Sequence, residues 1–338
     1  MATTILIDRA PGSWSMPESA LNVVADYGAH ADGFTNDADH VQAAVTALGT
    51  AGGDVYFPPG SYALTTSIKL PPSNAATMTF WGYGAKVILS GSTSFLEFAD
   101  TTNWQAFRHF TVKGFEVDAA ARWAGSSGYV ITAFNAFGNY FVKRGDVEYI
   151  TLEDLNVHGA PSLGSGGTAC AIALGCKQGG IVGSTSSVDG VTENTMQYVR
   201  HINIDNVTIS GGDTGILVNT ECKVEGLPGS IPADFNMTVD DVNISNVWFD
   251  SGRRPPYGTT YMHTGIQIGV WGRGGTCTVS DCYLRGSYDN LLEIDNMQVA
   301  NVSRVACIEN RNHAFTLTRF GYPADAVVGC AVWFKTSS

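Results

Sequence analysis

Residues 199–219 read VRHINIDNVTISGGDTGILVN and carry the pattern that decides the fold. Their apolar residues follow a fixed order, namely Ile202, Ile204, Val207, Ile209, Ile216 and Val218. Alternation with a period of two indicates short β-strands, since successive side chains of a strand point to opposite faces. The stretch therefore predicts a short strand, a one-residue kink, a second strand, a turn and a third strand.

The same order of apolar residues returns five more times. The copies are HFTVKGFEV (109–117), YITLEDLNV (149–157), VDDVNISNVWF (239–249), TCTVSDCYL (276–284) and VANVSRVAC (299–307). Val279 and Val302 hold equivalent places 23 residues apart, which is about one coil of a parallel β-helix. A coil cannot bury its own apolar face, but stacked coils share one core. An antiparallel sandwich, the alternative, does not explain why the order returns in phase.

The predicted fold is all-β: a single-stranded right-handed parallel β-helix with an N-terminal capping helix. The run ADHVQAAVTALGTAGG (38–53) places Val41, Ala44, Val45 and Leu48 on one helical face. A helix there would cover the exposed end of the first coil, because open sheet edges invite aggregation. We expect an N-terminal extension over residues 1–21 and one β-helix domain over 22–338, with the capping helix at about 38–48.

Two segments near the start carry a family resemblance. They are NVVADYGAHADGFTNDADHVQAAV (22–45) and GGDVYFPPGSYAL (52–64), and they resemble the N-terminal signature of the pectate-lyase-like right-handed parallel β-helix superfamily. The matching residues are Asp26, Tyr27, Gly28, Asp32, Gly33, Thr35, Asp37, Gln42, Gly52, Gly53, Phe57, Pro58, Pro59, Gly60 and Tyr62. The resemblance implies structural roles for them in the cap and first coil. Members of the superfamily include polysaccharide lyases, glycoside hydrolases, epimerases and bacteriophage tailspike or depolymerase proteins.

The active sites of these relatives match only in part. Polygalacturonases carry an Asp-Asp pair at the place of GGDTGI (211–216), where this chain has Asp213 followed by Thr214. Classical pectate lyases carry an Arg-x-Pro-x-x-Arg element, and GRRPPYG (252–258) offers Arg253 and Arg254 without a second arginine at that spacing. Neither specific activity follows from the resemblance.

The amino-acid composition narrows the range of expected binding partners. The 338 residues have 19 basic and 31 acidic side chains, a formal net charge of -12. Such a surface repels nucleic acid and anionic membranes, and no apolar run reaches the ~20 residues of a membrane span. No signal peptide is visible at the start, so we expect a phage virion or release to the extracellular space after lysis. The 7 cysteines lack metal-binding spacing and are expected as small core residues.

Aligning the third strands of successive coils gives a candidate site on their outward face. Each outward column collects residues of adjacent coils: Asp213, His263 and Asp289; Leu217, Gln267 and Glu293; Asn219, Gly269 and Asp295; Glu221, Trp271 and Met297. Because glycine has no side chain, Gly265 and Gly269 are expected to let a sugar ring approach the backbone of this face. The segment 251–262 precedes one of these strands and would bring Arg253, Arg254, Tyr257 and Tyr261 to its edge.

Two chemistries fit these residues. In a lyase, His263, Tyr261 or an arginine of the 251–262 segment would be the base. Asp289, Glu293 and Asp295 could hold Ca²⁺ against a substrate carboxylate. In an inverting hydrolase, paired carboxylates such as Asp213 and Asp289 would act, with Glu293 as a further candidate. Substrate-binding roles are expected for Trp271, Arg253, Arg254, Tyr257, Gln267 and Asn219.

The sequence therefore predicts an enzyme that cleaves an extracellular, uronate-containing polysaccharide. β-Elimination is the first expectation, and inverting glycoside hydrolysis is the second. A third alternative is a non-catalytic, trimeric phage receptor-binding or structural protein. The predicted partner is a polysaccharide, with no nucleic acid and no membrane, and a homotrimer is one expected state. The predicted cofactor is Ca²⁺ or none.

Overall fold

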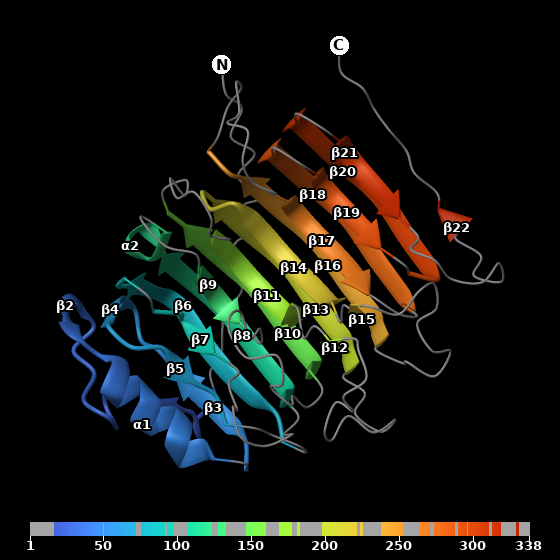
Figure 1. Ribbon diagram of the computed structural model, residues 1–338. Coiled ribbons are helices and arrows are strands. Elements are labelled where there is room, and N and C mark those ends of the chain that lie inside the picture. The colour runs from blue at the N-terminus through green and yellow to red at the C-terminus, as the bar shows by residue number, and fades with distance from the viewer. Residues whose placement is uncertain are drawn as a thin grey trace.

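A computed structural model gives the architecture. It describes residues 17–49, 51–71, 76–91, 93–97, 107–123, 128–132, 147–159, 169–177, 181–182, 198–221, 224–225, 238–252, 264–270, 274–287, 290–295, 297–310, 313–318 and 329–330. Parallel strands stack in chain order from the N-terminal cap at one end towards β22 at the other (Figure 1). This is the predicted right-handed parallel β-helix, and its parallel pairing excludes the antiparallel sandwich.

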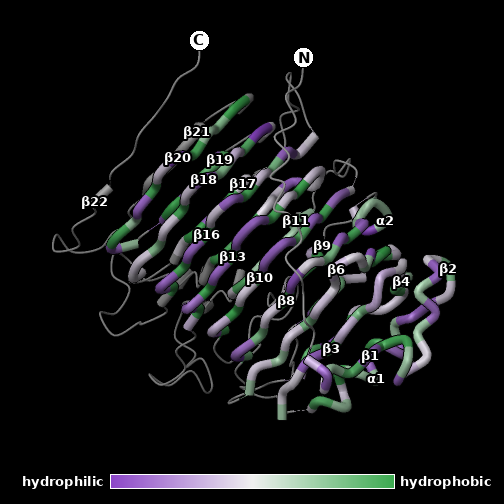
Figure 2. Tube along the Cα trace, turned by 180° about the vertical axis from the view of Figure 1, so that it is seen from behind, coloured by the Kyte–Doolittle hydropathy of each residue, from purple (hydrophilic) through white to green (hydrophobic). Residues whose placement is uncertain are grey.

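One sheet has 12 strands and forms two sides of the coils. Its strands are β1 (Leu21–Asn22), β2 (Asp32–Asn36), β3 (Gly53–Tyr56), β4 (Gly60–Leu64), β6 (Met78–Leu89), β8 (Phe107–Asp118), β10 (Val147–His158), β13 (Tyr198–Ser210), β16 (Thr238–Asp250), β18 (Thr276–Ser287), β20 (Val299–Asn310) and β22 (Gly329–Cys330). Figure 2 shows hydrophilic and hydrophobic residues alternating along the long strands of this sheet. That alternation separates a core face from an outer face.

A second sheet of 8 strands closes the coils. Its strands are β5 (Ile68–Lys69), β7 (Leu96–Glu97), β9 (Gly128–Thr132), β11 (Ala169–Lys177), β14 (Thr214–Glu221), β17 (Thr264–Val270), β19 (Asn290–Asp295) and β21 (His313–Thr318). β12 (Ile181–Val182) and β15 (Val224–Glu225) form a separate pair. The helices are α1 (Ala38–Leu48) and α2 (Ala120–Trp123). Among the described residues, no helix is long and apolar enough to span a bilayer.

The predicted coil alignment is confirmed by the pairing register. Ile204 pairs with Ile244, Ile244 with Val279, and Val279 with Val302. All four side chains are buried. Coil length varies nevertheless, because Val147 pairs with Phe107 on one side and with Val199 on the other.

The predicted kink in the long strands is a residue with positive φ. In successive coils it falls on Gly114, Asp154, Asn206, Asn246, Asp281 and Arg304. Left-handed backbone is disfavoured for most L-residues, and Asn and Asp tolerate it best. The side chains also bond along the column: Asn206 Nδ2 donates to Asp154 Oδ1 (2.6 Å), and Tyr83 Oη donates to Asp154 Oδ2 (2.7 Å). The kink is therefore held by neighbouring coils.

The core runs through all coils as one apolar cluster. At its N-terminal end the rings of Phe57, Phe95 and Phe115 pack edge to face or tilted, with centroids 4.9–6.3 Å apart. Cys170, Cys277 and Cys282 are buried and Cys307 is partly buried, as expected of small core residues. Burial raises the pKa of the Cys282 thiol to about 12.

The capping helix α1 lies over the first coil at the predicted position (Figure 1). It buries Ala38, Val41, Ala44 and Val45. Gln42 fixes the helix to β5, because its amide accepts from Lys69 N (2.7 Å) and donates to Lys69 O (3.0 Å). The division into residues 1–21 and 22–338 stays a prediction.

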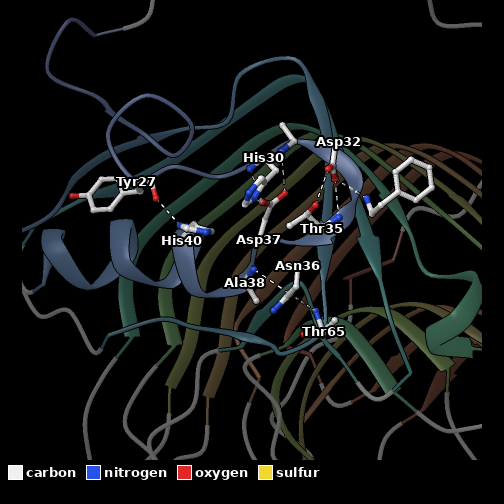
Figure 3. Close-up of polar contacts among 11 residues, drawn as sticks. Tyr27, His30, Asp32, Thr35, Asn36, Asp37, Ala38, His40 and Thr65 are labelled. Carbon is white, nitrogen blue, oxygen red and sulfur yellow. Dashed lines mark hydrogen bonds and ion pairs between the residues drawn. The ribbon is translucent and has the colours of Figure 1, made fainter.

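Four residues of the N-terminal signature, Tyr27, Asp32, Thr35 and Asp37, make polar contacts within the cap (Figure 3). The Asp37 side chain is fully buried and accepts from the backbone N–H groups of His30 (2.6 Å) and Ala31 (3.1 Å). Asp32 accepts from the N–H groups of Phe34 and Thr35, and these bonds lower its pKa to about 2. The signature thus builds the cap, in agreement with the structural roles that the resemblance implied.

Candidate functional site

The outward face of the 8-stranded sheet has the register that the sequence predicted. Leu217 pairs with Gln267, Gln267 with Glu293, and Glu293 with Thr316. The next outward column runs from Asn219 through Gly269 to Asp295. The candidate residues of the two columns therefore lie in adjacent coils, about 4.8 Å apart.

Glu293 and Asp295 are the two carboxylates that this register brings together. They flank the buried Ile294 on β19, so both face outward, and two residues of a strand span about 6.6 Å. Asn290 Nδ2 donates to Glu293 Oε2 (3.1 Å), which orients that carboxylate. Asp295 is 8% exposed, and its register partner in the neighbouring coil is Gly269, which is also buried.

Asp213 belongs to a different part of this face. It directly precedes β14, is 1% exposed, and its N–H donates to Ala169 O (2.7 Å). Relative to Glu293 it is displaced by two coils and by four residues along the strand. These displacements correspond to about 16 Å between the backbones. Asp213 and Glu293 are therefore too far apart to act on the same glycosidic bond, which needs carboxyl groups within ~9.5 Å.

Two expectations for this face are wrong. A Cβ at Gly265 would lie 3.2 Å from Phe249 Cδ1 and 2.6 Å from Leu291 O, so Gly265 faces the core instead of lowering the outer surface. The cause is a break in alternation, because Leu291 and Leu292 are both buried in the core. Met297, expected to face outward, lies beyond the end of β19 and is 2% exposed in the same core.

The outward face carries an apolar patch in the coils just before β17. Tyr129, Cys170, Ala173 and Leu217 form a small buried cluster separate from the core. Gln267 and Glu293 are partly exposed, whereas Leu217 is 3% exposed. The polar residues around Glu293 therefore begin at β17 and continue through β19, and a separate polar group, Lys69, Glu97 and Thr132, lies in the same column nearer the N-terminus.

Several predicted site residues lie outside the described residues. They are His263, Asp289, Tyr261, Trp271, Arg253, Arg254 and Tyr257. The backbone of Asn219 is described, and it pairs with Gly269. The roles of these residues stay predictions.

The fit of Ca²⁺ to the carboxylate pair is incomplete. Glu293 and Asp295 together offer at most about four of the 6–8 oxygen ligands that Ca²⁺ takes. The described part of the chain adds no third acidic, histidine or cysteine side chain that would complete a metal site. Calcium stays a prediction, and no chemical step is derived through it.

The structure also shows a surface cluster that the sequence analysis missed. The rings of His109, Tyr149 and His201 stack across three coils, with centroids 4.6 and 4.4 Å apart. His201 Nδ1 donates to Asp241 Oδ2 in the next coil (2.8 Å). All four residues have positive φ, and Tyr149 is 44% exposed. Stacking of this kind contributes roughly 0.5–1.5 kcal/mol per pair, which offsets the backbone strain.

Beside this stack lies a buried carboxylate. Glu148 is 2% exposed and accepts from Arg108 Nε and Arg200 Nε, one from each adjacent coil. Arg200 also lies over the ring of Tyr198, 4.5 Å from its centroid. A sequence signal was present: each stacked residue directly precedes the first apolar residue of the repeated pattern, as in His109-Phe110 and Tyr149-Ile150. These contacts join coils, and we assign the stack and the Glu148 pairs a structural role.

Comparison with known proteins agrees with this architecture. Residues 20–122 match the family model described as "Rhamnogalacturonase A/epimerase, pectate lyase-like". The chain is 26% identical over 243 residues to a probable rhamnogalacturonase B of Neosartorya fischeri, covering 67% of this chain and 43% of that protein. It is 26% identical over 279 residues to a rhamnogalacturonase A of Aspergillus aculeatus, covering 77% of this chain and 56% of that protein. The chain thus spans about half the length of these relatives.

Solved structures give more distant likenesses. ORF18 of Geobacillus virus E2 aligns with a TM-score of 0.37 and 14% identity, covering 90% of this chain and 62% of that one. The Streptococcus pneumoniae surface protein and adhesin PfbA aligns with a TM-score of 0.37 and 13% identity, covering 92% of this chain and 100% of that one. Such values support no conclusion about activity. The coil register shows the parallel β-helix fold, and the N-terminal signature and the family match over residues 20–122 support the resemblance to the pectate-lyase-like right-handed parallel β-helix superfamily.

Proposed function

We propose that the protein is a carbohydrate-active enzyme that cleaves a pectin-like, uronate-containing polysaccharide, and that it does so by hydrolysis. The observation that carries this proposal is the outward carboxylate pair Glu293 and Asp295, with Gln267 beside it in the adjacent coil. The names of the relatives, rhamnogalacturonases, support the same class of substrate and a hydrolytic reaction. A location outside the producing cell, or on a phage particle, follows from such a substrate.

We infer inversion as the course of the reaction. The backbones of the two residues are about 6.6 Å apart, so their carboxyl groups can be placed within the ~6.5–9.5 Å typical of inverting enzymes. Glu293, oriented by Asn290, would take a proton from water while the water oxygen bonds to the anomeric carbon. Asp295 would donate a proton to the glycosidic oxygen as its bond to that carbon breaks. Asp295 is the better candidate for the acid because burial in general disfavours a charged carboxylate.

β-Elimination, expected first from the sequence, receives less support. A lyase must neutralise the uronate carboxylate with a cation and remove the proton next to it. β17 (TGIQIGV) and β19 (NLLEID) contain no lysine or arginine. The cations and bases predicted for this reaction, Ca²⁺, Arg253, Arg254, Tyr261 and His263, stay predictions, because these four residues lie outside the described part of the chain.

A panel of pectin-derived and neutral polysaccharides tests the proposal. New reducing ends without absorbance from an unsaturated product indicate hydrolysis, and the anomer first released, read by NMR, reports inversion or retention. Glu293→Gln and Asp295→Asn should each lower kcat by roughly 10²–10⁴. Glu153→Gln is the matched control, since Glu153 is an outward acid on the 12-stranded sheet, paired with Lys113 at 2.7 Å.

The outcomes separate the alternatives. An unsaturated product supports a lyase and overturns hydrolysis. Folded Glu293→Gln protein with full activity overturns the assignment of the site. Binding without any cleavage favours the third expectation, a receptor-binding or structural protein, for which analytical ultracentrifugation tests the predicted trimer.

A further inference from the structure

Two aromatic side chains lie together on the outer face of the 12-stranded sheet. Trp248 of β16 and Tyr283 of β18 are register partners in adjacent coils. Their ring centroids are 6.2 Å apart and their planes differ by 4°. Both face outward, because their chain neighbours Val247, Phe249 and Leu284 are buried in the core. Trp248 and Tyr283 are themselves partly exposed.

Small residues border the pair along the column. Trp248 pairs with Thr208 in the preceding coil, and Tyr283 pairs with Ala306 in the following coil. Thr208 and Ala306 are both exposed. A hydroxyl-bearing side chain and a methyl group are too short to cover an indole or phenol ring. The outer faces of the pair are therefore not covered by their neighbours in this column.

Planar polar groups border the pair on both sides along the strands. Two residues before the aromatic pair stand Asn246 and Asp281, and Arg304 Nη2 donates to Asp281 Oδ2 at 2.6 Å. Two residues after the pair stand Asp250 and Arg285, whose charged groups are 3.8 Å apart. Each border lies about 6.6 Å from the aromatic column. Amide, carboxylate and guanidinium groups thus line an aromatic centre.

This arrangement matches the chemistry of a sugar ring. A pyranose has faces made of C–H groups, which pack against aromatic rings, and a rim of hydroxyl groups. Carboxylate and guanidinium groups can each form two hydrogen bonds, so they suit neighbouring hydroxyls. Binding sites commonly combine apolar and aromatic surface with a few placed polar groups in this way. Nucleobases also stack on aromatic rings, and the saccharide is preferred here because the ligand class follows from the proposed function.

We propose that Trp248 and Tyr283, with Asn246, Asp281 and Arg304 at their border, form a second saccharide-binding site on the outer face of the 12-stranded sheet. The ligand is a segment of a polysaccharide whose chain follows the coil axis from Trp248 to Tyr283. The ligand class rests on the proposed function, whereas the site itself does not use Glu293 or Asp295. The two sites occupy different sheets of the coil, so this one binds polymer without taking part in bond cleavage.

The proposal predicts a difference between long and short substrates. A polymer can contact both sheets at once, and tethering it at one site raises its effective concentration at the other. Loss of the aromatic pair should therefore raise KM for polymer and leave kcat and the KM for a short oligosaccharide unchanged. Loss of Glu293 should lower kcat for both substrates.

Affinity electrophoresis and titration calorimetry with rhamnogalacturonan, polygalacturonate and a neutral glucan test this directly. Trp248→Ala and Tyr283→Ala should each weaken binding of the bound polymer roughly tenfold. Tyr283→Phe keeps the ring and should bind within about twofold of the unaltered protein. Circular dichroism and the oligosaccharide assay report whether each variant is folded.

The outcomes distinguish this inference from the proposed function. Unchanged polymer affinity in folded Trp248→Ala and Tyr283→Ala protein overturns the second site, whatever Glu293→Gln does to activity. A change of mass in analytical ultracentrifugation with unchanged polymer affinity identifies a contact between copies of the chain and also overturns it. If the unaltered protein binds none of the polymers in the panel, the second site is overturned as well. Weakened binding together with retained oligosaccharide cleavage supports it.

Discussion

Asn206 allows the energetics of the coil kink to be measured. It has φ of 53°, and its side chain donates to Asp154 Oδ1 at 2.6 Å. Asn206→Ala removes that hydrogen bond, worth about 1–1.5 kcal/mol, and places an ordinary residue in left-handed backbone, which costs about 1–2 kcal/mol. We therefore expect a loss of about 2–3.5 kcal/mol in the free energy of unfolding.

Asn206→Gly separates the two contributions. Glycine adopts positive φ without steric cost, so this variant loses the hydrogen bond but not the backbone compatibility. It should be more stable than Asn206→Ala by about 1 kcal/mol, even though glycine destabilises an ordinary strand position. Thr208→Ala, an exposed position on the same strand, is the control and should change stability by less than about 0.5 kcal/mol.

Urea unfolding followed by circular dichroism measures these differences. Hydrogen exchange of β10, β13 and β16 should accompany it, because stacked coils can unfold in parts and a single transition must be verified. The reasoning is refuted if Asn206→Gly is as unstable as Asn206→Ala. In that case left-handed backbone is not what selects asparagine at this position.

Three further variants test other parts of the structure. Gln42→Ala should speed hydrogen exchange in α1 and β5 together, since Gln42 bonds both backbone groups of Lys69; faster exchange in α1 alone would contradict that coupling. The pKa of Asp32 is lowered to about 2 from an ordinary 3.8, so its contribution to stability is present above about pH 4 and is lost as pH falls towards 2. Asp32→Asn should accordingly weaken the dependence of the melting temperature on pH between pH 4 and pH 2. An unchanged dependence would argue that the hydrogen bonds from the N–H groups of Phe34 and Thr35 do not stabilise the Asp32 carboxylate. Burial raises the pKa of Cys282 to about 12, so iodoacetamide at pH 8 should leave its peptide unmodified in folded protein and modify it in urea, as mass spectrometry can show.

The alternation of apolar residues predicted most of the fold. It gave the pairing of Ile244 with Val279 and of Val279 with Val302, because a period of two fixes which side chains enter the core. It failed at Gly265, since the corner that leads into the third strand directs two successive residues inward, as Leu291 and Leu292 show. Strict alternation holds within a strand but not through a bend.

The site was predictable in its register but not in its burial. The sequence placed Glu293 and Asp295 on one face, and the pairing of β17 with β19 confirms that placement. Outward direction did not predict exposure, because Leu217 shares a column with Gln267 and yet is 3% exposed. The stack of His109, Tyr149 and His201 was missed because coils of unequal length separate its members by 40 and then 52 residues.

Unequal coils have a consequence for how such a protein can change over evolutionary time. A coil of 52 residues (Val147 to Val199) and one of 23 (Val279 to Val302) both place their apolar side chains in register in the same core. Closing the longer loop costs only about 0.7 kcal/mol more, since loop entropy grows with the logarithm of length. Segments at the corners can therefore be lengthened or exchanged at little thermodynamic cost while the rungs stay in register. The stacked strands that form the core and the segments at the corners are therefore free to diversify at different rates.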